Sequence, residues 1–199
     1  MLKNPIPQVT NQLQYRAIGI IHGKFKPLHS EQLNRGFLID KKGEKIETVV
    51  LGKALSLLKK HIDLKKSYYW IVYPKNKNTQ ILHLQVAGIW DPYQLNDFPN
   101  DSSKANFSKL LEELDLKDNY FSVRGELVFV NTQKKEIVIK ICSAAKLKNL
   151  KSKNFKLVIK GELSLKLLNS FVSLEINRDG NELKLISYEV IEKDLSKNN

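Results

Sequence analysis

The segment Leu51-Gly-Lys-Ala-Leu-Ser-Leu-Leu-Lys-Lys-His-Ile-Asp-Leu64 breaks the two-residue hydrophobic period of the first half of the chain. Leu55, Leu58 and Ile62 recur at helical spacing and share one face, whereas the lysines of the segment fall on the opposite side. This spacing predicts a short amphipathic helix over residues 53–64. Its position among the strands decides the fold.

Strand-like runs flank this helix on both sides. Three runs precede it and two follow it, at residues 15–25, 36–39, 46–51, 68–73 and 81–90. Gly19 and Gly23 in the first run suit a strongly bent strand. The order β-β-β-α-β-β, with the helix between the third and fourth strands, is that of the oligonucleotide/oligosaccharide-binding (OB) barrel.

A connector follows, opening with Asp91-Pro92 and rich in turn residues. Within it Ser103 can cap a helix whose apolar residues share one face, at Phe107, Leu110, Leu111 and Leu114. We expect this helix to dock between domains. An exposed helix that binds a partner is the alternative.

The strand pattern restarts at Tyr120. Five runs recur, at residues 120–131, 136–144, 155–160, 169–177 and 183–191. Arg178-Asp-Gly-Asn181 supplies a hairpin turn between the last two, and the helix of the first half is reduced here to residues 164–169. The sequence therefore predicts a mainly β protein with minor α structure. Two tandem OB-like five-stranded barrels are expected at residues 1–92 and 119–195, with residues 93–118 as the connector.

Composition limits the class of protein. A hydrophobic fraction of 42%, a charged fraction of 27% and a mean hydropathy of -0.34 favour a water-soluble globular chain and exclude a membrane protein. The N-terminal residues show no apolar leader, and the single Cys142 cannot form an intramolecular disulfide. Both features are typical of a cytoplasmic protein.

The formal net charge of +12 would attract polyanions. Only four basic residues are arginines, so lysine supplies the other 29 of the 33. A lysine and asparagine excess of this kind also arises from an AT-rich genome without selection for binding. Function and genome composition therefore both stay open as explanations of the charge.

Four stretches of the chain are distinctive: Tyr15-Arg-Ala-Ile-Gly-Ile-Ile-His-Gly-Lys-Phe25, the helical segment at residues 51–64, Trp70-Ile-Val-Tyr-Pro74 and Tyr120-Phe-Ser-Val-Arg-Gly125. In these stretches the chain resembles a family of functionally uncharacterised cyanobacterial proteins. The resemblance spans most of the chain and implies a cyanobacterial cytoplasmic setting. It brings no known activity and no catalytic residues.

The sequence contains none of the usual catalytic or phosphate-binding motifs, neither a P-loop, nor a dinucleotide-binding glycine motif, nor a nucleophile elbow, nor a zinc-protease helix. His22, His29, His61 and His83 are far apart in sequence and are interpreted as solvated or core-edge imidazoles. We therefore expect a protein that is not an enzyme, with no cofactor and no metal.

Aromatic groups that stack on bases and cations that follow phosphates mark the candidate nucleic-acid contacts. They cluster at the first strand, at the fourth strand and its loop, and between Lys134 and Lys160, where nine lysines face one acid. The predicted contact residues are Arg16, Lys24, Phe25, Lys26, Trp70, Lys75, Lys77, Arg124, Lys140, Lys146, Lys148, Lys151, Lys153, Lys156 and Lys160. Core packing is the alternative for each aromatic, and a solvated loop is the alternative for the lysine run.

The leading hypothesis is a binding protein for single-stranded nucleic acid, RNA rather than DNA, with little sequence specificity. The alternative is a protein-protein adaptor or assembly factor that uses one barrel and the connector helix, since the fold serves both functions. The sequence leaves the oligomeric state, the ligand and any sequence preference open.

Overall fold

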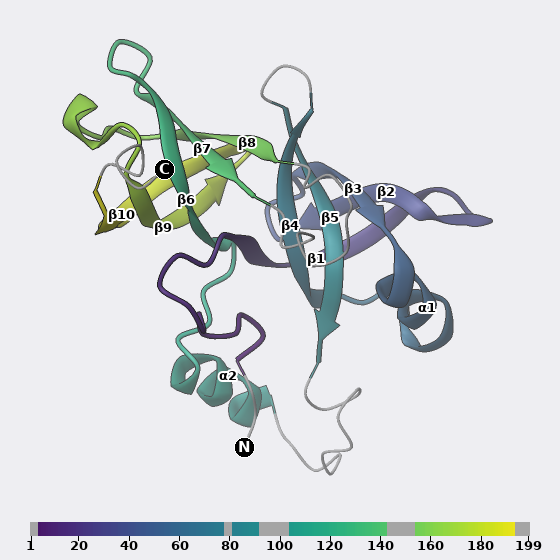
Figure 1. The fold of residues 1–199 in the computed structure, drawn as a ribbon. Helices are drawn as coiled ribbons and strands as arrows, with labels where there is room; N and C mark the ends of the chain where they lie inside the picture. The colour runs from purple at the N-terminus through teal and green to yellow at the C-terminus, as the bar shows by residue number, and fades with distance from the viewer. Residues whose placement is uncertain (1–3, 78–80, 92–103, 143–153, 194–199) are drawn as a thin grey trace. The chain divides into compact units, whose positions relative to one another are not determined.

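A long first strand begins each half of the chain. Strand β1 runs Arg16–His29 and strand β6 runs Tyr120–Asn131. The computed structural model describes residues 4–77, 81–91, 104–142 and 154–193 (Figure 1). In each half the first strand pairs with two partners, and this double pairing closes a barrel.

The first barrel contains five strands and one helix. After β1 come β2 (Gln32–Asp40), β3 (Lys45–Val50), α1 (Gly52–His61), β4 (Tyr68–Lys77) and β5 (Ile81–Trp90). The hydrogen-bonded order is β2-β3-β5-β4-β1, and β1 pairs again with β2 to close the ring. Helix α1 lies between β3 and β4 in sequence and beside β2 in space. This arrangement confirms the predicted OB fold.

The second barrel repeats this topology. Its remaining elements are β7 (Glu136–Ile141), β8 (Phe155–Lys160), the 3-10 turn η2 (Leu165–Leu167), β9 (Phe171–Asp179) and β10 (Glu182–Glu192). The order is β6-β7-β8-β10-β9, and β9 pairs with β6 to close the ring. A single 3-10 turn thus stands where the first barrel has a ten-residue helix, as the reduced pattern in the sequence indicates.

A glycine marks the point at which each first strand bends. Gly23 pairs with Asp40 of β2 and also with Tyr68 of β4, so β1 changes partners at this residue. A Cβ atom on Gly23 would overlap the carbonyl oxygen of Ile39. Gly125 is the counterpart in β6, because a Cβ there would overlap the carbonyl oxygen of Lys140 on β7. Close approach of two backbones therefore requires glycine at both positions.

Alternating side chains fill the interior of each barrel. Phe25, Leu38 and Ile46 lie opposite one another on β1, β2 and β3, and all three are buried. In the second barrel the matching row is Leu127, Ile139 and Leu157. Paired residues on neighbouring strands point to the same side of the sheet. Because side chains alternate along a strand, the residues before and after each of these buried positions point outward.

Helix α2 (Lys104–Glu113) packs on the core of the first unit. Leu110 belongs to a buried cluster with Ile20, Tyr69 and Trp90, and Leu111 packs against the same cluster. The described apolar side chains of this helix thus contact the first unit, and its docking between domains stays a prediction. The side chain of Phe107 lies outside the described residues.

By its internal contacts the chain divides into two compact units. The first unit comprises Met1–Pro7, Gly19–Tyr73 and Leu84–Tyr120, and the second comprises Gln8–Ile18, Pro74–His83 and Phe121–Asn199. Each unit thus gathers segments that are separated in sequence. The proposed folding domains at residues 1–92 and 119–195 stay a prediction.

Replacing the bend glycines should destabilise the barrels. We expect Gly23→Ala and Gly125→Ala each to lower the free energy of unfolding by about 1–3 kcal/mol, because the new methyl group meets backbone that cannot move aside. Gly88→Ala is the control, since the nearest atom to its Cβ is the Cδ1 of Ile71 at 3.5 Å, an ordinary contact. Urea unfolding followed by circular dichroism measures all three, and equal losses in all three would contradict the argument.

Candidate nucleic-acid interface

Three neighbouring strands of the first barrel share one outward face. Lys26 on β1 lies opposite Phe37 on β2, and Phe37 lies opposite Glu47 on β3. One row further along, Lys24 lies opposite Ile39, which lies opposite Lys45. We call this surface the β1-β2-β3 face, and its outward residues are Lys24, Lys26, Arg35, Phe37, Ile39, Lys45, Glu47 and Val49.

The cations of the β1-β2-β3 face are available to a ligand. Lys24, Lys26, Arg35 and Lys45 are all exposed. Among the residues that the structure describes, none of the four forms an ion pair. Four cations without a protein counterion on one face make a surface that attracts phosphate groups.

Phe37 is the aromatic residue of this face, and the sequence analysis did not select it. Its ring is half-buried among the outward residues, with Lys26 beside it on β1. A partly exposed ring next to lysines is the arrangement on which a base stacks while the phosphates contact the cations. The signal in the sequence was the alternation of outward Arg35, Phe37 and Ile39 with inward Gly36 and Leu38.

The two aromatics that the sequence analysis selected for stacking lie in the core instead. Phe25 has 2% of its surface exposed and Trp70 has none. Their rings pack together at a centroid distance of 5.8 Å, and the Trp70 Nε1 donates a hydrogen bond of 2.8 Å to the Gly23 carbonyl. Both predictions are wrong, because alternation turns these positions inward. Trp70 stabilises the bend at Gly23.

Both predicted arginines are held by the protein itself. The Arg124 side chain is buried, its Nη2 donates to the Gln12 carbonyl at 2.6 Å, and its guanidinium lies 5.9 Å from the Phe171 ring centroid. Its prediction as a phosphate contact is therefore corrected. Arg16 is half-buried, and its Nη2 donates to the Ser122 Oγ at 2.6 Å.

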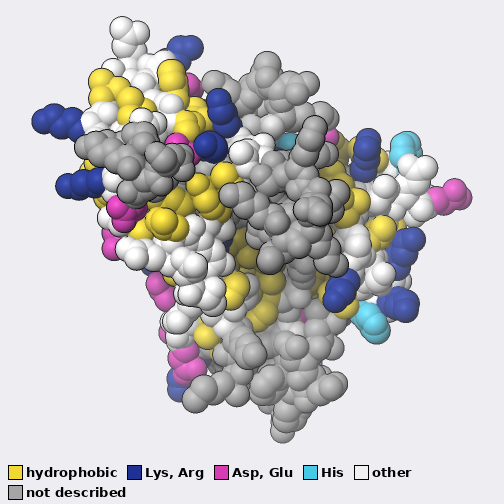
Figure 2. All heavy atoms as spheres, viewed as in Figure 1, with side chains coloured by type: hydrophobic (Ala, Val, Ile, Leu, Met, Phe, Trp, Pro, Cys, Tyr) yellow, Lys and Arg dark blue, Asp and Glu magenta, His cyan; other side chains and the backbone are white. Residues whose placement is uncertain are grey.

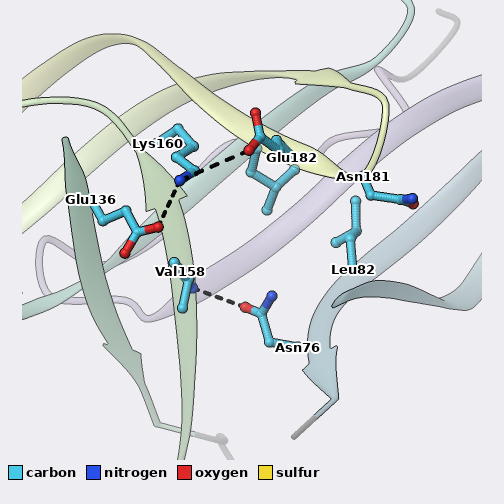
Figure 3. Close-up of a pocket in the computed structure, with 8 residues that line it drawn as sticks. Asn76, Leu82, Glu136, Val158, Lys160, Asn181 and Glu182 are labelled. Carbon is cyan, nitrogen blue, oxygen red and sulfur yellow. Dashed lines mark hydrogen bonds and ion pairs between the residues drawn. The ribbon is translucent and has the colours of Figure 1, made fainter. Parts of the chain in front are cut away.

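On the second barrel, acidic residues lie across from the predicted lysines. The Lys140 Nζ lies 2.8 Å from Glu126 on β6, and the Lys160 Nζ lies 2.6 Å from Glu136 on β7. These hydrogen bonds raise the pKa of each lysine. Figure 3 shows Lys160 between Glu136 and Glu182, the latter at 3.9 Å, in a pocket of about 70 Å³. The strand register thus neutralises two cations of the predicted basic surface.

The remaining predicted lysines differ in their surroundings. Lys156 is exposed and forms no ion pair within the described part of the chain. The Lys75 Nζ lies 3.2 Å from the Phe155 ring centroid, and burial lowers its pKa. The Lys77 side chain and the whole of Lys146, Lys148, Lys151 and Lys153 lie outside the described residues. On the face drawn in Figure 2, the Lys and Arg side chains stand singly or in small groups.

His22 lies at the edge of the first core. Its backbone N–H donates to the Asp118 Oδ1 at 2.7 Å, and its ring lies 4.6 Å from the Tyr69 ring centroid. Burial lowers the pKa of the imidazole, the positive charge of Lys41 lowers it further, and Asp118 opposes both effects. The position fits a structural core-edge imidazole, as interpreted from the sequence.

The described residues show neither a metal site nor a membrane-spanning helix. Over residues 4–77, 81–91, 104–142 and 154–193, no group of three or more His, Cys, Asp or Glu side chains is placed to hold a metal ion. No helix in the described part of the chain is long and apolar enough to cross a bilayer.

Comparison with known families gives two matches. Residues 17–97 match the model described as "PatR RNA-binding protein, N-terminal OB-fold domain". Residues 123–192 match the model described as "Cyanobacterial OB-fold-like RNA-binding domain, C-terminal". Each match covers most of one barrel, and both descriptions name RNA binding. A comparison with curated proteins finds no match.

The lowered pKa of His22 predicts a pH effect on stability. Its imidazole binds a proton less readily in the folded state than in the unfolded state, so its contribution is present above about pH 6.5 and is lost as the pH falls. We expect His22→Gln to reduce the loss of unfolding free energy between about pH 7.5 and about pH 5.5. His61→Gln, at an exposed position of α1, is the control. An unchanged pH dependence in His22→Gln would contradict this assignment.

Proposed function

The chain belongs to the cyanobacterial family of OB-fold RNA-binding proteins that these two domain models describe, and from that premise we propose that it binds single-stranded RNA through phosphate contacts and limited base stacking. In this function the protein binds RNA and does not catalyse a reaction on it. The first barrel supplies the principal contacts through its β1-β2-β3 face.

The position of this face supports the proposal. OB barrels in general bind oligonucleotides over the face of their second and third strands and the loops beside it. Here that face combines one partly exposed ring, Phe37, with four cations that form no ion pair with the described residues. The coincidence of free charge and an aromatic ring on the binding side of the fold is the single observation that carries the proposal.

Little sequence preference follows from the same chemistry. Lysine and arginine contact phosphates, which are the same at every nucleotide, and an aromatic ring stacks on any base. On the second barrel, we propose that Lys156 contacts phosphate in its own right, and we propose the same role for Lys146, Lys148, Lys151 and Lys153. Lys140 and Lys160 contribute less, because each is already paired with a carboxylate.

Salt dependence tests the phosphate contacts. In the double variant Lys24→Gln/Lys26→Gln, we expect weaker binding to a single-stranded RNA and a salt dependence of log K that is shallower by about 1.4, since each lost contact to a single strand contributes about 0.7. Fluorescence anisotropy over a series of salt concentrations measures both quantities.

The matched control for this test is Lys59→Gln/Lys60→Gln. It removes the same charge from exposed positions on α1, which are not among the residues of the β1-β2-β3 face. We expect its salt dependence to stay close to that of the unchanged protein. If the two double variants lose affinity equally, net charge and not this face governs binding.

Variants at Phe37 and Trp70 distinguish a residue that stacks on RNA bases from one that stabilises the fold. Phe37→Ala is expected to lower RNA affinity by about 5- to 150-fold, the range for one base stacked on an aromatic ring, with little effect on unfolding. Trp70→Phe removes the buried hydrogen bond to Gly23 and is expected to lower the free energy of unfolding by about 1–3 kcal/mol while RNA affinity is retained. The reverse pattern would show that the stacking residue is Trp70.

A further inference from the structure

A pocket of about 330 Å³ opens on the second barrel. It lies between the end of β6, the residues that follow β8, and the middle of β10. Its lining residues are Val130, Asn131, Thr132, Glu162, Leu163, Ser164 and Tyr188. All of them belong to the second unit. The volume is at the lower end of the range of about 300–1,000 Å³ for small-ligand pockets, so it suits a ligand of nucleoside size.

The short connection between β8 and β9 forms part of the pocket wall, through Glu162, Leu163 and Ser164. In the first barrel the equivalent connection is helix α1, which buries Ala54 and Leu58. In the second barrel the connection forms only the turn η2, which buries none of its residues. Within the described residues, the register of β10 with β8 is the pair Lys184 and Lys160, whereas its pairing with β9 runs from Glu182 to Glu192. Tyr188 lies on this later part of β10, opposite Leu174 of β9.

The walls of the pocket are apolar and aromatic. Leu163 is buried and Val130 is half-buried, whereas 49% of the Tyr188 surface is exposed. The partly exposed ring of Tyr188, next to the apolar side chain of Leu163, offers a stacking surface for a flat ligand.

The rim of the pocket is polar and retains hydrogen-bonding capacity. The Asn131 Oδ1 accepts from the Lys134 N–H at 3.0 Å, and the Ser164 Oγ accepts from the Lys166 N–H at 3.3 Å. Within the described part of the chain, the Asn131 amide group donates no hydrogen bond, and the Thr132 hydroxyl makes none. Donors are therefore available at the mouth of the pocket.

Glu162 gives the pocket its electrostatic character. Its carboxylate is exposed and lies 2.7 Å from the Lys135 Nζ, which holds it at the rim. A carboxylate accepts hydrogen bonds from amino and ring N–H groups but repels phosphate. The pocket is thus better suited to the uncharged edge of a base than to the backbone of a nucleic acid.

We propose that this pocket receives one unpaired nucleobase of the bound RNA. The base stacks on Tyr188 over the floor formed by Leu163, and its polar edge bonds to Asn131, Thr132 and Glu162. The inference rests on the proposed function, because it adds a base-binding subsite to a protein that otherwise contacts phosphates. Single-stranded RNA is the suitable partner, since its bases are free to leave the stack.

The test compares Tyr188→Ala with Tyr73→Ala in the full chain. Tyr73 is a matched control, because it is a strand tyrosine of the first unit with 41% of its surface exposed. We expect Tyr188→Ala to lower the affinity for single-stranded RNA by about 5- to 150-fold with an unchanged salt dependence, because no charge is lost. Tyr73→Ala is expected to bind as the unchanged protein does.

A fluorescent base provides a second readout. With a single 2-aminopurine in the RNA, stacking on Tyr188 should change the emission on binding, and this change should be lost in Tyr188→Ala and reduced in Thr132→Val. Unchanged affinity and emission in Tyr188→Ala, while the unchanged protein binds RNA, would overturn the pocket and leave the proposed function standing. Failure of the unchanged protein to bind any single-stranded RNA would overturn both.

Discussion

Each barrel depends on the close approach of two backbones at a glycine. At Gly23 the first strand leaves one partner and joins another, and the carbonyl oxygen of Ile39 occupies the space of a side chain. Gly125 meets the carbonyl oxygen of Lys140 in the same way. A strand that pairs on both sides of such a bend closes a sheet of five strands into a ring, which removes its edges. The bend also sets the register, and the register decides which side chains point outward.

Register explains why two barrels of one topology differ in charge. In the first barrel, Lys24 and Lys26 lie opposite Ile39 and Phe37, and neither lysine forms an ion pair with any described residue. In the second barrel, Lys140 lies opposite Glu126, and Lys160 lies opposite Glu136. The half with the denser run of lysines therefore has fewer free cations on the strands that the structure describes. The number of lysines in a segment is a poor guide to its binding capacity.

Strand order was predictable because hydrophobic period and turn residues are local signals. The interior rows follow from alternation, and the helical spacing over residues 53–64 predicted α1. The stacking residues were harder to predict. Phe25 and Trp70 were selected for stacking from the sequence, yet both are buried, whereas Phe37, which was not selected, is partly exposed. Which aromatic faces out depends on where a strand begins, and a shift of one residue reverses every side chain.

The sequence by itself determined the classes of structure in this protein: ten strands, a helix in the first half, its reduced counterpart in the second, and a strong excess of positive charge. Tertiary structure alone decided which of those charges are free, which aromatics are exposed, and that Tyr188 stands over a pocket with Leu163 and Glu162. The physical reason is the distance along the chain over which each kind of interaction acts. Periodicity and turns act between neighbours in the chain, but an ion pair or a pocket joins residues on different strands, and only closure of the barrel places those strands side by side.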